Sequence, residues 1–436
     1  MNTKRNLLLG SLFLLSTGTA FASESSAASK ADNSFLLLCA ALVFLMQAGF
    51  CLVEMGFSRA KNSINIIMKN MCDMAAGSIG YFFIGFGLMF GWSQGGIVGL
   101  GNFGFSSEYG SDHVIWGFFL FQMMFAAAAA TISSGAMAER TYFPGYLLYA
   151  VIGCGLIYPF LGHWVWGGTG AGFGFGNTQG WLAKMGFSDF AGATVVHSVG
   201  GAFALAGIIV IGPRKGRFME DGSARIFPGH NVPLASLGMF LLFFGWFGFN
   251  CGSQLTADAE IGRIGVNTVL AACGGLISAL IFHWVTKGWA EPGSTINGAL
   301  GGLVAITACC HCVAPWAAIV IGLLAGVIVV FGESAMLKLK LDDAVGAVPV
   351  HLLCGIWGAL AVSIFNETQP FANLHIQALG AFVVPITAFG LVWVVFQIIN
   401  KTVGLRATDD AQDMGLDFAE HSSTAYPDFA INEEED

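Results

Sequence analysis

The sequence predicts an all-α integral membrane protein with eleven transmembrane helices, arranged as two inverted five-helix repeats plus a final helix. Three observations predict this fold. Of 436 residues, 55% are hydrophobic and only 10% are charged, whereas about 25% of the residues of an average soluble domain are charged. Eleven apolar segments approach or exceed the roughly 20 residues that a membrane-crossing helix needs. A short motif also recurs in the fifth and tenth of these segments.

The first 22 residues are predicted to be a signal peptide. Lys4 and Arg5 precede an apolar run that ends in Ala20-Phe21-Ala22, and a polar stretch follows. A basic start, a short apolar run and a small-x-small ending are typical of a secretory signal. A retained first helix is the alternative, which the shortness of the run disfavours. We therefore expect a signal peptide at 1–22, a transmembrane domain at 23–400 and a cytoplasmic tail at 401–436.

The predicted spans are too long, and too rich in Gly, Ala and Leu, for the alternating strands of an outer-membrane barrel. They cover residues 34–53, 66–91, 114–137, 142–162, 190–212, 231–251, 264–285, 294–311, 314–336, 346–366 and 376–400.

The basic residues predict the orientation. Twelve lie in the loops that follow the odd-numbered spans, and three lie on the other side. The positive-inside rule then places the mature N-terminus outside the cell and the C-terminus in the cytoplasm, as a multi-pass protein of the inner membrane. The net charge of −9 says little about partners because much of the acid lies in the tail, and no nucleic-acid partner is expected.

The ten cysteines mostly stand singly in apolar spans, where Cys behaves as a small hydrophobe. Only Cys309, Cys310 and Cys312, in the segment CCHC, are close together. A disulfide between these cysteines is possible, because this segment is predicted to lie on the outer face. Four adjacent residues cannot surround one ion, so neither a metal site nor a cofactor is expected.

The recurring motif indicates where the functional site lies. DFAGATVVHSVGG begins at Asp189 and DAVGAVPVHLLCG begins at Asp343, so His197 and His351 occupy matched positions. Two five-span halves insert in opposite orientations, and such repeats carry their site near the bilayer midplane, where the halves meet. We expect the two histidines to face each other there.

A lone histidine on an apolar helix is more often a satisfied core residue than a working one. Two at matched positions favour function, because polar side chains in hydrocarbon are costly and usually line a pathway. Two imidazolium ions in contact would repel, so the pair should hold at most one extra proton. The spacing alone does not distinguish between three roles for the pair: proton relay, binding of a small uncharged molecule, and ligation of haem or a metal.

A set of motifs in order resembles the ammonium transporter (Amt) family over nearly all of the mature chain. The motifs are GFSRAKN, FQMMF, GAMAER, YPFLGHWVWGG, DFAGATVVH, GWFGFNCGS, DDAVGAVPVHLLCGIWG and the tail pattern GLD…H…AYP. The resemblance implies a non-enzymatic homotrimer whose subunits each have eleven spans and a narrow central pore. It also implies ammonium or ammonia as the substrate, and it raises a PII-type regulatory protein as a cytoplasmic partner.

The resemblance implies an outer recruitment site for ammonium at Trp166 and Ser253, and a stacked gate at Phe125 and Phe249. Trp166 can hold a cation over its ring, although an interfacial Trp in an aromatic belt is the alternative. For the two Phe residues the alternative is ordinary packing, because the chain has 39 Phe.

The resemblance further implies that His197 and His351 line the pore and that Asp189 supports the recruitment site. Asp189 could bind the cation or cap the fifth span, and the capping role is favoured. Asp343 is expected to cap the tenth span. Lys69 and Asp73, four residues apart on the second span, are expected to neutralise each other.

Some positions depart from the family's usual pattern. Gly346 stands where members often have Asp, Val348-Pro349 where they often have Phe-Gly, and Ala193 where Gly is frequent. These changes bear on the width of the pore near His351. The tail keeps GLD and AYP but adds an acidic end.

The sequence therefore predicts a high-affinity ammonium transporter of the bacterial inner membrane, acting in nitrogen uptake. It would capture NH4+ outside, remove a proton below the Phe gate, and pass NH3 along the histidines while the proton moves separately. The alternatives are an Rh-like channel for neutral NH3 or CO2, an ammonium sensor with little transport, and a bis-histidine haem oxidoreductase. Trp166 and Ser253 argue against the first of these.

Overall fold

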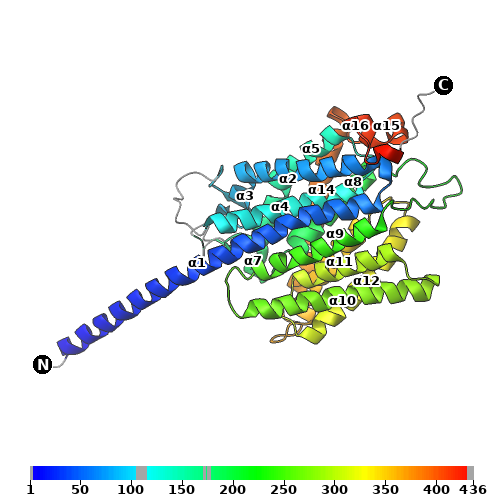
Figure 1. Ribbon diagram of the computed structural model, residues 1–436. Helices are drawn as coiled ribbons and strands as arrows, with labels where there is room; N and C mark the ends of the chain where they lie inside the picture. The colour runs from blue at the N-terminus through cyan, green and yellow to red at the C-terminus, as the bar shows by residue number, and fades with distance from the viewer. Residues whose placement is uncertain (1–2, 105–114, 170–172, 174–177, 430–436) are drawn as a thin grey trace, which may run out of the picture.

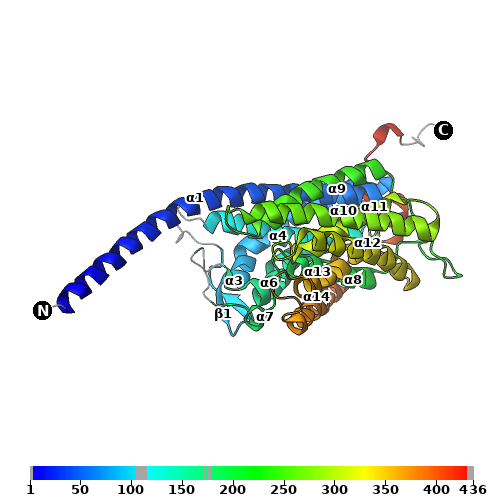
Figure 2. The same cartoon turned by 90° about the horizontal axis from the view of Figure 1, so that it is seen from below.

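The structure, a computed structural model, consists mainly of helices that run roughly side by side (Figures 1 and 2). It describes residues 3–104, 115–169, 173 and 178–429, and for residues 3–29 it describes the backbone only. The predicted all-α fold is confirmed in this part of the chain.

Nine helices among the described residues are long and apolar enough to cross a bilayer, and each overlaps one predicted span. They are Lys30–Phe57, Ala60–Phe90, Ile115–Ala136, Phe143–Trp166, Ala193–Ile211, Val232–Cys251, Glu260–Lys287, Pro315–Lys338 and Leu374–Thr402.

The two other predicted spans correspond to shorter helices. The prediction at 294–311 meets Pro292–Thr307, which has 16 residues, and the prediction at 346–366 meets the apolar helix Val348–Ile364. The count of eleven spans therefore stays a prediction.

Several helices begin with a proline in their first turn, and several spans contain a π-helical segment. Pro144, Pro233, Pro292 and Pro315 each stand in the first turn of a helix, where the missing N–H leaves no bond unmade. The elements of the first half are α1 (Thr3–Phe57), η1 (Ala60–Asn62), α2 (Ser63–Gly80), η2 (Tyr81–Gly85), α3 (Phe86–Phe90), α4 (Ile115–Ala136), α5 (Phe143–Ile152), η3 (Gly153–Ile157), α6 (Tyr158–Trp166), α7 (Trp181–Met185), η5 (Ala193–Ser198) and α8 (Val199–Ile211).

Among the described residues, π-helical segments occur at η2, η3, η5, η6 and η7, three of them before residue 212 and two after it. The elements of the second half are α9 (Val232–Trp246), η6 (Phe247–Cys251), α10 (Glu260–Lys287), α11 (Pro292–Thr307), α12 (Pro315–Lys338), η7 (Val348–Leu353), α13 (Cys354–Ile364), α14 (Leu374–Thr402), α15 (Asp409–Met414), α16 (Leu416–His421) and η8 (Pro427–Phe429).

A small hairpin is the one sheet in the described residues, and the sequence analysis did not predict it. Strands β1 (Trp92–Gln94) and β2 (Val98–Leu100) pair antiparallel, with Ser93 opposite Gly99. The Trp181 N–H at the start of α7 bonds to the carbonyl of Gly96 in the hairpin turn. The hairpin and α7 lie at the end of the bundle from which α1 projects, as Figure 2 shows.

Residues 3–22 of the predicted signal peptide form the first part of α1, and residues 1–2 lie outside the described residues. The helix continues without a break into the first span and extends beyond the bundle (Figure 1). Cleavage after Ala22 stays a prediction.

Glycines let the fifth and tenth spans cross at close range. A Cβ added to Gly201 on α8 would lie 2.4 Å from the backbone nitrogen of Leu352. A Cβ added to Gly355 on α13 would lie 2.4 Å from the carbonyl oxygen of Ala193 and 2.4 Å from the hydroxyl of Ser198. These are the matched glycines of the repeated motif, and each removes the side chain that would hold the two backbones apart.

Charged side chains join the loops that follow the odd-numbered spans. Arg214 donates to Glu139 at 2.7 Å and to Asp342 at 2.9 Å, and Arg59 pairs with the same Glu139. The Arg140 guanidinium donates to the backbone carbonyl of Asp342. One buried network therefore ties the loops after the first, third, fifth and ninth spans together.

The tail packs against the same end of the bundle, where Figure 1 places α15 and α16. Lys61 donates to the carbonyls of Gln412 and Asp413, both at 2.7 Å. Asp417 accepts from the backbone N–H of Asn65 at 2.8 Å, and burial raises the pKa of Asp417. The prediction that these loops and the tail share one face agrees with these contacts.

Two smaller expectations can be compared with the structure. No ion pair joins Lys69 and Asp73 among the described residues: Lys69 donates to the carbonyl of Ser134 at 3.0 Å, and Asp73 accepts from Tyr146. Cys309, Cys310 and Cys312 are all free thiols here, so the disulfide left open in the CCHC segment does not form in this structure.

Replacing Gly355 with Ala should destabilise the protein, because the added methyl group meets the backbone of η5. Overpacking a tight core typically costs about 1–3 kcal/mol. Gly390→Ala on α14 is the matched control, since nothing lies within 4 Å of its added Cβ and Ala favours helix. Thermal unfolding in detergent should show a lower Tm for the first variant and not for the second; equal Tm values would contradict the close crossing.

Asp342→Asn should lower stability at neutral pH. Burial alone would raise the pKa of Asp342, but hydrogen bonds from Arg214 and the charges of Arg140 and Arg214 outweigh it and hold this pKa well below its ordinary value. A depressed pKa stabilises the fold above the unfolded value of about 3.9 and loses this contribution as the pH falls below it.

The Tm of Asp342→Asn should therefore fall well below that of the wild type at pH 7, and the gap should narrow below about pH 4. Breaking a buried ion pair typically costs about 3–5 kcal/mol. Asp413→Asn removes the exposed pair with Lys215 and should change Tm little. A gap that does not change with pH would contradict this account.

Candidate functional site

A column of stacked rings runs through the centre of the bundle. Phe125 on α4 and Phe249 on η6 stack with centroids 4.0 Å apart and planes 22° apart. Phe249 stacks in turn on His197 at 5.3 Å, and His197 stacks on His351 at 5.3 Å. All four side chains are buried. The structure therefore brings together both predicted gate residues and both predicted pore histidines.

The two histidines contact each other directly. Their Nδ1 atoms are 3.2 Å apart, so one ring donates and the other accepts when both are neutral. The Nε2 atom of His197 is buried and has no hydrogen-bond partner among the described residues. His197 is 0% exposed and His351 is 6% exposed. One unsatisfied imidazole nitrogen therefore stands in an otherwise apolar column.

The histidines lie on matched π-helical segments, His197 on η5 and His351 on η7. Such segments are rare and often occur at functional sites. Phe249 also lies on a π-helical segment, η6. The wider turn is a tertiary feature that the residue spacing did not predict.

Asp189 and Asp343 cap these two segments in the same way. Asp189 accepts from the backbone N–H groups of Gly192 at 3.0 Å and Thr194 at 2.8 Å. Asp343 accepts from those of Gly346 at 2.9 Å and Val348 at 2.7 Å. The geometry agrees with the capping role expected for both residues.

Gly192 and Gly346 have φ angles of 109° and 81°, in the left-handed region that favours glycine. Gly346 is a position where the sequence departs from the usual family pattern. Asp also adopts this conformation more readily than most other residues. Both the Gly at position 346 and the Asp that is frequent in the family therefore suit the turn.

Trp166 and Ser253 lie at the Phe end of the column. Trp166, 8% exposed, donates from Nε1 to the carbonyl of Asp189 at 2.7 Å and meets the Phe125 ring edge-on at 6.1 Å. The hydroxyl of Ser253 donates to the carbonyl of Phe249 at 2.8 Å. No hydrogen bond joins Trp166 to Ser253 in the described residues, but each contacts one of the two stacked Phe residues.

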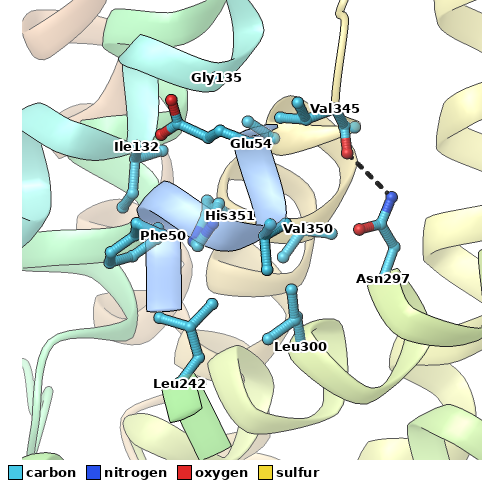
Figure 3. Close-up of a pocket in the computed structure, with 13 residues that line it drawn as sticks. Phe50, Glu54, Ile132, Gly135, Leu242, Asn297, Leu300, Val345, Val350 and His351 are labelled. Atoms are coloured by element: carbon cyan, nitrogen blue, oxygen red, sulfur yellow. Dashed lines mark hydrogen bonds between the residues drawn. The ribbon is translucent and has the colours of Figure 1, made fainter. Parts of the chain in front are cut away.

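A small cavity of about 30 Å³ lies next to His351, at the His351 end of the ring column, and Figure 3 shows the residues that line it. Phe50 on α1 borders it, with its ring centroid 6.2 Å from that of His351. The lining is apolar apart from three side chains, which are Glu54, Asn297 and His351.

Sequence reasoning missed four residues here. Trp246 stacks on His197 at 5.1 Å, with its Nε1 bonded to Thr307, and Phe50, Glu54 and Asn297 line the cavity. Glu54 lies one residue beyond the predicted span 34–53, and only the longer structural span Lys30–Phe57 includes it; an acid directly after an apolar span was the one usable signal, because ionisable residues within membrane spans are rare and usually functional. Trp246, Phe50 and Asn297 carried none, since many similar residues occur in the spans.

The geometry restricts the chemistry of this column. A fully dehydrated monovalent cation would find little there to replace its water, whereas a small neutral molecule needs only one hydrogen-bond partner. The haem alternative does not fit, because two nitrogens in hydrogen-bond contact with stacked rings leave no room for a porphyrin between them.

Comparisons with known proteins agree with this geometry. The family model described as "Ammonium Transporter Family" matches residues 34–426. The ammonium transporter Amt2 of Archaeoglobus fulgidus is 41% identical, over 97% of this chain and 96% of its own. A putative ammonium transporter of Synechocystis sp. is 44% identical, over 90% of this chain and 88% of its own.

A solved structure has the same fold. A protein titled "Sensor Amt Protein" superposes with a TM-score of 0.86 and 41% identity, covering 91% of this chain and 99% of its own. Because the family model and two full-length relatives cover nearly all of the sequence, the chain belongs to the ammonium transporter family.

Proposed function

We propose that the ring column is the pore of an ammonium transporter of the bacterial inner membrane. The observation that carries the proposal is the unbroken series of ring contacts from Trp166 through Phe125 and Phe249 to His197 and His351. In this proposal NH4+ is captured beside Trp166 and Ser253, and the stacked Phe pair separates this site from the histidines.

The proposed chemistry follows from desolvation. Below the Phe gate an N–H bond of NH4+ breaks as an N–H bond forms on an imidazole nitrogen of the histidine pair, which leaves NH3 as the species that continues along the column. NH3 can donate to or accept from the free His197 Nε2, so it is not left without a partner. The released proton passes separately through the hydrogen-bonded Nδ1 atoms of the histidine pair.

We propose eleven spans in two inverted halves plus a final helix, with the C-terminus in the cytoplasm. The identical caps of η5 and η7 support the repeat. The meeting of the tail with the basic loops at one end supports the orientation, because basic loops lie on the cytoplasmic side. A homotrimer and a PII-type partner for the tail are proposed from family membership.

An ammonium sensor with little transport is the second candidate. It is favoured by the similarity to the structure named "Sensor Amt Protein". An Rh-like channel for neutral gas is the third candidate, and the separate Trp166 and Ser253 contacts at the Phe pair argue against it.

Current across a solid-supported membrane distinguishes these candidates. Proteoliposomes with the wild-type protein should give a sustained current after an ammonium jump and none after a potassium jump. Asp189→Ala should abolish it, because η5 loses the cap that places His197. Internal alkalinisation without current would indicate a neutral gas channel, and saturable ammonium binding with neither signal would indicate a sensor.

His351→Ala should lower the ammonium current about tenfold or more, because positioned proton-transfer groups typically contribute at least this much. It should also weaken the discrimination against potassium, since water can enter the vacated space. His375→Ala, which removes an exposed imidazole at the start of α14, is the matched control and should leave both unchanged. Wild-type current and selectivity in His351→Ala would contradict the histidine route.

A further inference from the structure

The cavity next to His351 has a single carboxylate in its wall, that of Glu54 (Figure 3). Glu54 lies on α1 one turn after Phe50, so the two side chains share a helix face. It is only 3% exposed. A buried acid on the inner side of a proposed proton route needs either a structural or a chemical reason.

The surroundings of the carboxylate hold it in place through two side-chain donors and the backbone of Gly135. Ser134 Oγ donates to Oε2 at 2.8 Å and Asn70 Nδ2 donates to the same atom at 3.1 Å. Both of these side-chain hydrogen bonds end on Oε2, and within the described part of the chain no side chain donates to Oε1. Gly135 makes room for this group, since an added Cβ would lie 2.9 Å from Glu54 Cγ.

The charges behind Glu54 do not balance. Lys69 and Asp73 on α2 are both fully buried, and Lys69 donates to the carbonyl of the same Ser134 that bonds Glu54. Two carboxylates and one ammonium leave one negative charge when all three are ionised. A net charge away from water is costly, and one additional proton removes it.

Glu54 is better placed than Asp73 to exchange a proton with the cavity. Both oxygens of Asp73 already accept hydroxyl hydrogen bonds, from Thr131 at 3.2 Å and from Tyr146 at 2.5 Å. Asp73 does not line the cavity, whereas Glu54 does. The other titratable groups that act on Glu54 or are acted on by it are Cys51 and Tyr146.

Water can connect Glu54 to the histidine pair. The cavity of about 30 Å³ exceeds the roughly 10–15 Å³ that one water molecule needs. Glu54, Asn297 and His351 supply polar partners for it. A single water between imidazole and carboxylate suffices for proton transfer.

We propose that Glu54 is the proton acceptor on the inner side of the histidine pair. An N–H bond of the His351 imidazolium breaks and an O–H bond forms on the Glu54 carboxylate, through water, which returns His351 to its neutral form. The O–H bond then breaks as the proton leaves to water in the inner mouth, and no oxidant or reductant is needed. The inference rests on the proposed transport function.

The test compares Glu54→Gln, which keeps size and hydrogen bonding, with Glu54→Asp, which keeps the acid. Glu333→Gln is the matched control, because Glu333 is another partly buried carboxylate bonded to a serine and an asparagine, Ser294 and Asn297. Asn297 lines the cavity but Glu333 does not. Each variant is reconstituted, and both the ammonium-evoked current and the internal alkalinisation are recorded from pH 5 to 8.

Glu54→Gln should lower the current about tenfold or more while alkalinisation by NH3 persists, and the pH profile of the residual current should change shape. Glu54→Asp should lose less current, and Glu333→Gln should behave as the wild type. If Glu54→Gln aggregates, an altered pH profile in Glu54→Asp supports the proposal.

Three results overturn the assignment of Glu54. They are wild-type current and pH profile in Glu54→Gln, an equal loss of current in Glu54→Gln and Glu333→Gln, and parallel loss of current and alkalinisation in both Glu54 variants, which indicates a structural role. Absence of ammonium-specific current in the wild type overturns the proposed function itself, and this proposal with it.

Discussion

The contact between His197 and His351 depends on a close crossing of two helices, and the rest of the structure is arranged around it. The Nδ1 atoms approach to 3.2 Å because Gly201 and Gly355 carry no side chains between the backbones. One aspartate holds the start of each crossing segment by accepting hydrogen bonds from backbone N–H groups: Asp189 for η5 and Asp343 for η7. A hydrocarbon environment offers no water to replace these bonds. The histidine contact therefore requires both the capping aspartates and the two glycines.

The crossing divides the interior into two parts with different chemistry. On the Phe side stacked rings fill the space, with Trp166 and Ser253 bonded to backbone carbonyls beside them. On the His351 side the space opens into a cavity with a carboxylate in its wall. Polar groups therefore flank the ring stack on both sides.

Charged side chains gather at the end of the bundle where the tail packs. Arg214 joins Glu139 to Asp342 across loops from different parts of the chain, and the tail adds contacts through Lys61 and Asp417. Arg214 connects three loops, because Glu139 and Asp342 lie in different ones, so moving one loop leaves a buried charge unpaired.

Sequence alone determined which segments are apolar enough to span a membrane, and the Asp-His repeat identified the two histidines. These features are local, because hydropathy and residue spacing do not depend on distant partners. The tertiary structure decided the partners: Lys69 bonds to Ser134 instead of pairing with Asp73, because packing against α4 offers a closer acceptor. It also decided the π-helical turns, the ring stack and the position of Glu54, since each depends on residues that are distant in sequence meeting at one point in the bundle.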